Sequence, residues 1–284
     1  MGYIDLHVHS TASDGTLTPA QVVRHAAEQD LDAIALTDHD TVSGIREAMA
    51  EAKEAGIRLI PGIELASRYQ GIEIHILGLF VDWEHAGFLA GLEDIRSIRS
   101  RRNEEMLRRF NRDGIDLTME DLTGTNPGTV ITRAHFARAL VSKGYAADVN
   151  RAFKTYLQAG GPYVPPREIV TPEAAVNLLH QAGAFIALAH PTLYKLGWEE
   201  IRSLVSLLKK LGMEGLEVYH SSNNQYESGR LKDIAREYGL LPTGGSDFHG
   251  SNKPDIAIGR GRGGLRVSSL LLDDIEQFRE QSRS

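Results

Sequence analysis

Short apolar runs alternate with helical stretches along most of this chain, and this alternation limits its possible folds more than any other feature. The apolar runs lie at residues 4–6, 33–36, 58–60, 72–80, 184–189, 215–219 and 240–243. Between them, helical stretches are predicted at about 18–29, 42–55 and 172–181, and in the segments that end near 211 and 238. Seven strands with crossover helices predict a parallel sheet. The length of 284 residues favours a closed α/β barrel, with an open doubly wound sheet as the alternative.

The interval 84–165 breaks this alternation. It contains a long arginine-rich helical stretch at about 87–113 and shorter ones at about 133–142 and 147–158, and Pro162, Pro165 and Pro166 close it. We therefore expect a barrel formed by residues 1–83 and 166–284, and a helical insertion at 84–165 that covers the site and recognises the substrate. The run from Arg96 to Arg112 is expected to be a solvated helix face paired with neighbouring acidic residues.

Composition excludes several classes of protein. The chain has no cysteine, so disulfides, zinc–thiolate sites and a cysteine nucleophile are ruled out. Its formal net charge of −7 argues against bulk binding of DNA. The N-terminus does not resemble a signal peptide, and no apolar run approaches the roughly 20 residues that span a bilayer. We expect a cytoplasmic protein without a membrane segment, and the sequence predicts no oligomeric state.

Metal-type ligands gather where the predicted strands end. His7 and His9 are two residues apart on an extended segment, so their side chains point to the same side. The same residue types follow or lie within other runs: Asp38, His39, Asp40, Glu64, His75, His190, His220, Asp247 and His249. Each has a simpler explanation alone, such as a helix cap or a core histidine, but the carboxyl ends of barrel strands converge on one mouth. We expect one shared site, whose imidazole and carboxylate ligands suit manganese, iron or zinc.

Five segments resemble motifs of the PHP (polymerase and histidinol phosphatase) superfamily. They are His7-Val8-His9-Ser10, Thr37-Asp38-His39-Asp40, Gly62-Ile63-Glu64, Ala189-His190-Pro191 and Ser246-Asp247-Phe248-His249. The resemblance implies a distorted seven-stranded (β/α) barrel that binds three divalent metal ions, with manganese preferred over iron or zinc. It implies these metal ligands: His7, His9, Asp14, His39, Glu64, His75, His190, Asp247 and His249. Glu64 would bridge two ions, and Asp14, His39 and His249 would hold the third.

The segments 9–16 and 132–135 resemble small stand-alone members of that superfamily, nearest to 3′,5′-nucleoside bisphosphate phosphatases and 5′-3′ RNA-trimming exonucleases. The resemblance implies a metal-dependent phosphoric monoester hydrolase that removes the 3′-phosphate of a 3′,5′-nucleoside bisphosphate, with 5′-3′ exonuclease activity on short 5′-phosphorylated RNA. The candidate catalytic residues are Glu64, Asp247, His249 and His220. A predicted N-cap at Thr132 places Arg133 and His135 in a first helical turn, which favours anions. Further candidates for substrate contact are Ser222, Asn223, Lys195 and Arg260.

Three alternatives remain open. The chain could be another small-molecule phosphatase, such as a histidinol phosphate enzyme, or a non-catalytic metal-stabilised module like the PHP domains of polymerases. An amidohydrolase would use a similar barrel, but no strand-end lysine stands where it would bridge two metal ions. A panel of phosphate esters separates the phosphatase alternatives.

Overall fold

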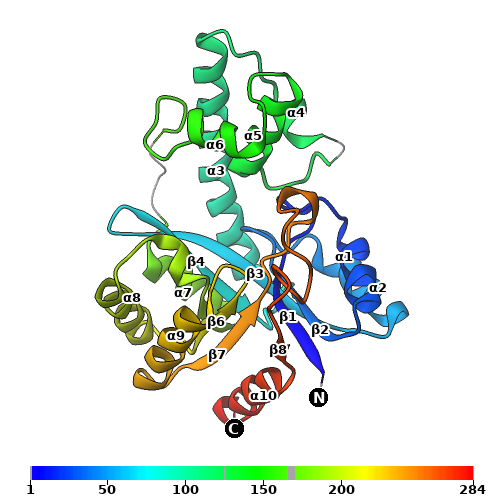
Figure 1. Cartoon of the computed structure of the whole chain (residues 1–284), viewed down its shortest axis with the longest axis vertical. Coiled ribbons are helices and arrows are strands. Elements are labelled where there is room, and N and C mark those ends of the chain that lie inside the picture. Colours follow the sequence, from blue (N-terminus) through cyan, green and yellow to red (C-terminus); the bar gives the residue numbers. More distant parts are fainter. Residues whose placement is uncertain (1, 125, 166–169, 284) are drawn as a thin grey trace.

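The computed structural model describes residues 2–124, 126–165 and 170–283 (Figure 1). Within this part of the chain one sheet has the strand order β7-β6-β5-β4-β3-β2-β1-β8. Its strands are β1 (Tyr3–Val8), β2 (Leu31–Leu36), β3 (Arg58–Tyr69), β4 (Ile72–Leu79), β5 (Phe185–Leu188), β6 (Gly215–His220), β7 (Leu241–Gly245) and β8 (Val267–Ser268). After β7 the chain returns to β1, where the amide of Asp247 donates to the carbonyl of His7 at 2.8 Å. The sheet is therefore a nearly closed barrel, as predicted.

The strands are not all parallel, which corrects the prediction of a parallel sheet. β4 is antiparallel to both β3 and β5, and the short β8 is antiparallel to β1. The cause is a two-residue turn at Gln70 and Gly71, whose positive φ angles of 47° and 85° suit a tight hairpin. His75 therefore lies inside β4, opposite Ala66, and not at the carboxyl end of a strand.

Helices cover the outside of the barrel. They are α1 (Pro19–Glu28), α2 (Ile45–Ala55), α7 (Pro172–Gln181), α8 (Trp198–Lys210) and α9 (Gln225–Glu237). Thr18 caps α1 and Thr171 caps α7, and each is followed by a proline that fits the first helical position. Two 3-10 turns, η1 (Pro191–Tyr194) and η2 (Gly250–Asn252), follow β5 and β7. No described helix combines the length and apolar character needed to cross a membrane.

An apolar cluster fills the inside of the barrel. It includes Ile4 and Leu6 of β1 and Phe185 of β5, together with Leu272 and Ile275 of the C-terminal helix α10 (Leu270–Arg283). The sequence did not predict α10, which packs at the end of the barrel far from the insertion (Figure 1). The opposite end of the barrel is therefore the one left for polar chemistry.

The insertion stands above the barrel (Figure 1). It contains α3 (Ala86–Arg112), α4 (Met119–Thr123), α5 (Arg133–Ser142) and α6 (Val149–Thr155), of which the short α4 was not predicted. These helices have their own apolar cluster, in which Phe110 stacks on Tyr163 with ring centroids 4.3 Å apart. The predicted domain boundary at 166, with Pro166, lies outside the described residues.

The arginine-rich face of α3 is only partly solvated. Arg108 is exposed and Arg96 is half-buried, and they pair with Glu105 and Glu93, as expected. Arg99 is 7% exposed and forms an ion pair with a barrel residue, Asp40, which corrects the prediction for this position. The difference arises because this turn of α3 faces the barrel mouth instead of solvent.

Candidate metal centre

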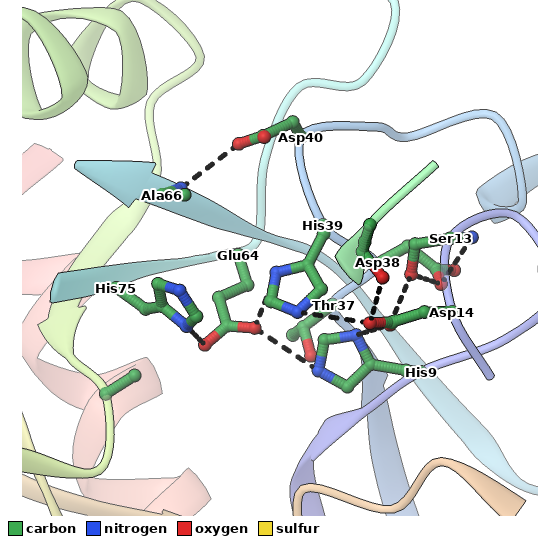
Figure 2. Close-up of polar contacts among 12 residues, drawn as sticks. His9, Ser13, Asp14, Thr37, Asp38, His39, Asp40, Glu64, Ala66 and His75 are labelled. Carbon is green, nitrogen blue, oxygen red and sulfur yellow. Dashed lines mark hydrogen bonds and ion pairs between the residues drawn. The ribbon is translucent and has the colours of Figure 1, made fainter. Parts of the chain in front are cut away.

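Glu64 lies at the centre of the barrel mouth and is 1% exposed. Figure 2 shows His9, His39 and His75 around its carboxylate. Five imidazole nitrogens lie within 3.4 Å of its two oxygens: Nε2 of His7 (3.4 Å), Nε2 of His9 (3.3 Å), Nδ1 of His39 (3.0 Å), Nδ1 of His75 (2.9 Å) and Nε2 of His190 (2.9 Å). They come from β1 and the loop after it, the loop after β2, β4, and the loop after β5, so the fold brings these distant segments to one carboxylate.

The remaining predicted ligands adjoin this group. Nε2 of His249 lies 3.2 Å from Oδ1 of Asp14, and its Nδ1 lies 3.3 Å from Oδ1 of Asp247. The His249 ring also stacks on His9, with ring centroids 4.0 Å apart. Four sets of residues place their ligand atoms within 4.8 Å of one another: His9, Asp14, His39 and His249; His7, Glu64 and His190; His7, His9 and Asp247; and His39, Glu64 and His75. The structure thus brings all nine predicted ligands into one cluster of overlapping sets.

The buried nitrogens of this cluster fit a metal centre. Within the described chain, Nε2 of His7, both ring nitrogens of His9, Nδ1 of His39 and Nδ1 of His190 are buried without a hydrogen bond. A buried polar atom without a hydrogen bond costs about 1–3 kcal/mol, and Nε2 of His7, Nε2 of His9 and Nδ1 of His39 all face the carboxylate of Glu64, so one partner beside that carboxylate would satisfy several of them. A divalent cation is such a partner, and the mixture of imidazole and carboxylate suits manganese, iron or zinc.

The charges of the cluster also suit cation binding. Burial raises the pKa of Glu64, but His75 and His39 outweigh it and hold that pKa well below its usual range. Burial, aided by His249, lowers the pKa of His9 to about 3. Burial also lowers the pKa of His75, but Glu64 prevails and raises it to about 10, so a cation must displace that proton. Metal binding at this centre is therefore expected to release protons.

Glu217 is a supporting residue that the sequence analysis missed. It is fully buried in β6, its Oε1 lies 2.9 Å from Nδ1 of His7, and its Oε2 accepts a 2.6 Å hydrogen bond from the amide of His190. A carboxylate on one ring nitrogen fixes a histidine with its other nitrogen toward a metal. The only signal in the sequence is a charged residue between Leu216 and Val218 in an apolar strand.

Asp38 and Asp40 support the loops on either side of His39 (Figure 2). Asp38 accepts 2.6 Å hydrogen bonds from the hydroxyls of Ser10 and Ser13, and so holds the loop that carries Asp14. Asp40 adopts a positive φ of 52° and accepts from the amide of Ala66 at 3.1 Å. Both aspartates therefore hold segments next to His39 and lie outside the four ligand sets.

A cavity of about 270 Å³ opens beside the cluster. Its lining includes the predicted ligands Asp14, His39, His75 and His249, and also the cationic side chains of Arg102, Arg133 and Lys253. Arg133 donates to Glu73 at 3.2 Å, and Nζ of Lys253 lies 2.5 Å from Oδ2 of Asp247. Arg133 was a predicted substrate contact, whereas Lys253 was not singled out, because no strand-end pattern marks it. The lining of this cavity therefore combines predicted metal ligands with cationic side chains.

The other predicted contacts lie elsewhere. His135 is buried, and its Nδ1 accepts from the amide of Thr132 at 3.1 Å, so it completes the cap of α5. Nε2 of His220 lies 3.5 Å from Oδ2 of Asp247, so this ring faces a predicted metal ligand. The four remaining candidates do not line this cavity. The backbone amide of Ser222 donates to Nδ1 of His220, and the side-chain amide of Asn223 donates to the carbonyl of Val218. Lys195 and Arg260 are exposed.

Comparison with known proteins agrees with this geometry. The model of the PHP domain family matches residues 5–164. The chain belongs to the PHP domain family. It is 36% identical to the 5′-3′ exoribonuclease Rnm of Escherichia coli, over 90% of this chain and 88% of that protein. It is 33% identical to a 3′,5′-nucleoside bisphosphate phosphatase of Chromobacterium violaceum, over 91% of each chain.

A solved structure supports the same assignment. A metal-dependent phosphoesterase from Bifidobacterium adolescentis superposes with a TM-score of 0.86 at 29% identity, covering 97% of this chain and 96% of that one. The PHP barrel and its family are therefore shown, and the chain is a metal-dependent phosphoesterase by family.

Proposed function

We propose that this protein removes the 3′-phosphate of 3′,5′-nucleoside bisphosphates and trims short 5′-phosphorylated RNA from its 5′ end. The observation that carries the proposal is a cavity whose lining includes both predicted metal ligands and cationic side chains. One phosphate of a bisphosphate would face the metal ligands, and the other would face Arg102, Arg133 and Lys253. Relatives over most of the chain bear the names of these two activities.

The proposed cofactors are three manganese ions held by the nine clustered histidines and carboxylates, with iron or zinc as alternatives. Bound divalent ions would lower the pKa of a water molecule and offset the charge of the phosphoryl oxygens. The chain itself supplies the ionised carboxylates of Glu64, Asp14 and Asp247, whose pKa values neighbouring cationic groups keep low against the effect of burial. It also supplies Arg133, whose planar guanidinium suits bidentate contact with a phosphate.

A substrate panel tests the proposal. Manganese-loaded protein would be assayed with adenosine 3′,5′-bisphosphate, the 3′- and 5′-monophosphates, histidinol phosphate, and short RNA with either a 5′-phosphate or a 5′-hydroxyl. We expect the highest kcat/KM for the bisphosphate, and RNA cleavage only with the 5′-phosphate. Equal kcat/KM for the bisphosphate and the monophosphates would contradict the proposal that the cavity binds both phosphates. Turnover of histidinol phosphate alone would support a histidinol phosphate enzyme instead.

Arg133→Ala tests directly whether the cationic side chains of the cavity bind a phosphate. Losing one charged contact to a phosphate should raise KM for the bisphosphate by roughly 10-fold or more, since such bonds are worth about 1.5–3 kcal/mol. Arg151→Ala, an exposed arginine of the same insertion, is the matched control and should behave as the wild type. The metal content of both variants should equal that of the wild type. Unchanged kinetics of Arg133→Ala on every substrate would show that Arg133 does not bind phosphate.

A further inference from the structure

The insertion touches the barrel at the loop that carries Asp14. Four residues between 126 and 132 form hydrogen bonds with four consecutive residues of this loop. The side-chain amide of Asn126 donates to the carbonyl of Thr11 at 2.8 Å, and the backbone amide of Val130 donates to the carbonyl of Ala12 at 3.0 Å. The hydroxyl of Thr129 donates to the carbonyl of Ser13 at 2.7 Å, and the hydroxyl of Thr132 donates to Oδ2 of Asp14 at 2.9 Å. We call residues 126–132 the strap.

The last of these bonds differs from the other three, because it ends on a side chain of the cluster. Thr132 and Asp14 are 7% and 5% exposed, so solvent does not compete strongly for their bond. The other oxygen of Asp14, Oδ1, lies 3.2 Å from Nε2 of His249, inside the set formed with His9 and His39. A hydroxyl on one carboxylate oxygen leaves the other oxygen directed toward that set.

Thr132 is itself held firmly. Its hydroxyl oxygen accepts from the amide of Ala134 at 3.2 Å as the N-cap of α5, and it lies 2.9 Å from Asp14 and 3.4 Å from Nδ1 of His135. Its own amide donates to Nδ1 of His135. The amide thus occupies the one lone pair of Nδ1, and the hydroxyl of Thr132 donates to the nearer acceptor, Asp14.

We infer that Thr132 is a positioning residue for the third metal ion, so that the insertion completes a metal site whose ligands all belong to the barrel. This inference rests on the metal centre of the proposed function. Hydrogen-bonded partners behind metal ligands commonly contribute 10- to 100-fold in metal affinity, about the effect expected here. Arg133, the next residue, lines the substrate cavity, so one turn of α5 contacts both the third-ion ligand and the substrate space.

The test is a manganese titration of metal-free protein, with bound ions counted by elemental analysis and electron paramagnetic resonance. Thr132→Val should retain two ions at wild-type affinity and bind the third about 10- to 100-fold more weakly. Thr132→Ser keeps the hydroxyl and should restore the third ion. Thr118→Val removes the similar capping box of α4, in which Thr118 bonds to Asp121, and should match the wild type.

Three results would overturn the inference. They are an unchanged third ion in Thr132→Val, an equal loss of all ions in that variant, or failure of Thr132→Ser to restore binding. Should Thr132→Val not fold, Thr129→Val removes another strap bond from a half-buried position and should weaken the third ion in the same direction. Wild-type protein that binds no manganese would contradict the proposed function as well, whereas wild type with three ions and an unchanged Thr132→Val contradicts this inference alone.

Discussion

Nε of Arg99, on the insertion helix α3, donates at 2.9 Å to Oδ2 of Asp40, in the barrel loop that carries His39. The amide of Asp40 in turn donates to the carbonyl of Glu64 at 3.0 Å. One buried ion pair therefore joins the insertion to the strand that carries the central carboxylate. Through this ion pair and the strap, the insertion holds two of the barrel segments that carry predicted metal ligands.

Arg99→Met should destabilise the protein by about 3 kcal/mol, because it leaves the carboxylate of Asp40 buried beside an apolar side chain. Chemical denaturation of metal-free protein measures this loss. Arg101→Met, on an exposed position of the same helix, should change the free energy of unfolding by less than about 0.5 kcal/mol. Similar stabilities for the two variants would show that the ion pair does not hold the insertion.

Glu217→Gln should weaken manganese binding by roughly 10-fold, because it removes the charge that favours the Nδ1–H form of His7. The matched control is Glu214→Gln, which alters a half-buried carboxylate that accepts from the amide of Ile186 away from the cluster. Competition with a fluorescent chelator gives both affinities. If Glu217→Gln binds manganese as tightly as Glu214→Gln, the buried carboxylate has no part in metal binding.

His135 should make the metal-free protein less stable as pH falls. Burial and Arg138 lower the pKa of His135 to about 4, so between about pH 6.5 and 4 the unfolded chain binds a proton that the folded chain excludes. Stability from this residue is complete above pH 6.5 and decreases by up to about 3 kcal/mol toward pH 4. His135→Gln keeps an acceptor for the cap and should show a smaller decrease.

Urea denaturation at pH 7 and pH 5, in the presence of a chelator, compares the two proteins. The other histidines titrate in both, so the difference between their pH dependences isolates residue 135. Parallel pH dependences would mean that His135 is readily protonated in the folded protein.

Local signals in the sequence were enough for much of the fold. Thr18 with Pro19, and Thr171 with Pro172, define helix starts by the chemistry of one turn, and α5 and α7 begin and end where predicted. The antiparallel β4 was missed although Gln70 and Gly71 are a typical hairpin turn, because the apolar run after them was taken for a further parallel strand. The short β8 and α10 had no separate alternation to mark them.

Some residues of the site could also be predicted from local signals, and others could not. Most of the ligand cluster could be predicted because histidines and carboxylates follow strands whose ends converge. His75 lies inside β4 instead, and Asp14 was expected only from the family resemblance. Glu217 and Arg99 could not be predicted, because their partners are distant in sequence: Glu217 contacts His7, 210 positions away, and Arg99 contacts Asp40, 59 positions away. Lys253 contacts the nearby Asp247, but no strand-end pattern marks it. His135 shows the converse, since a residue in a first helical turn can serve the cap instead of a ligand.

The central claim is that the clustered histidines and carboxylates hold divalent cations around Glu64. Elemental analysis of protein loaded with manganese and then desalted tests it most directly, with Glu64→Ala beside the wild type and His180→Ala as an exposed histidine control. We predict about three manganese ions per chain in the wild type and in His180→Ala, and loss of bound manganese in Glu64→Ala while it stays folded. Equal metal content in all three proteins, or none in the wild type, would contradict the account.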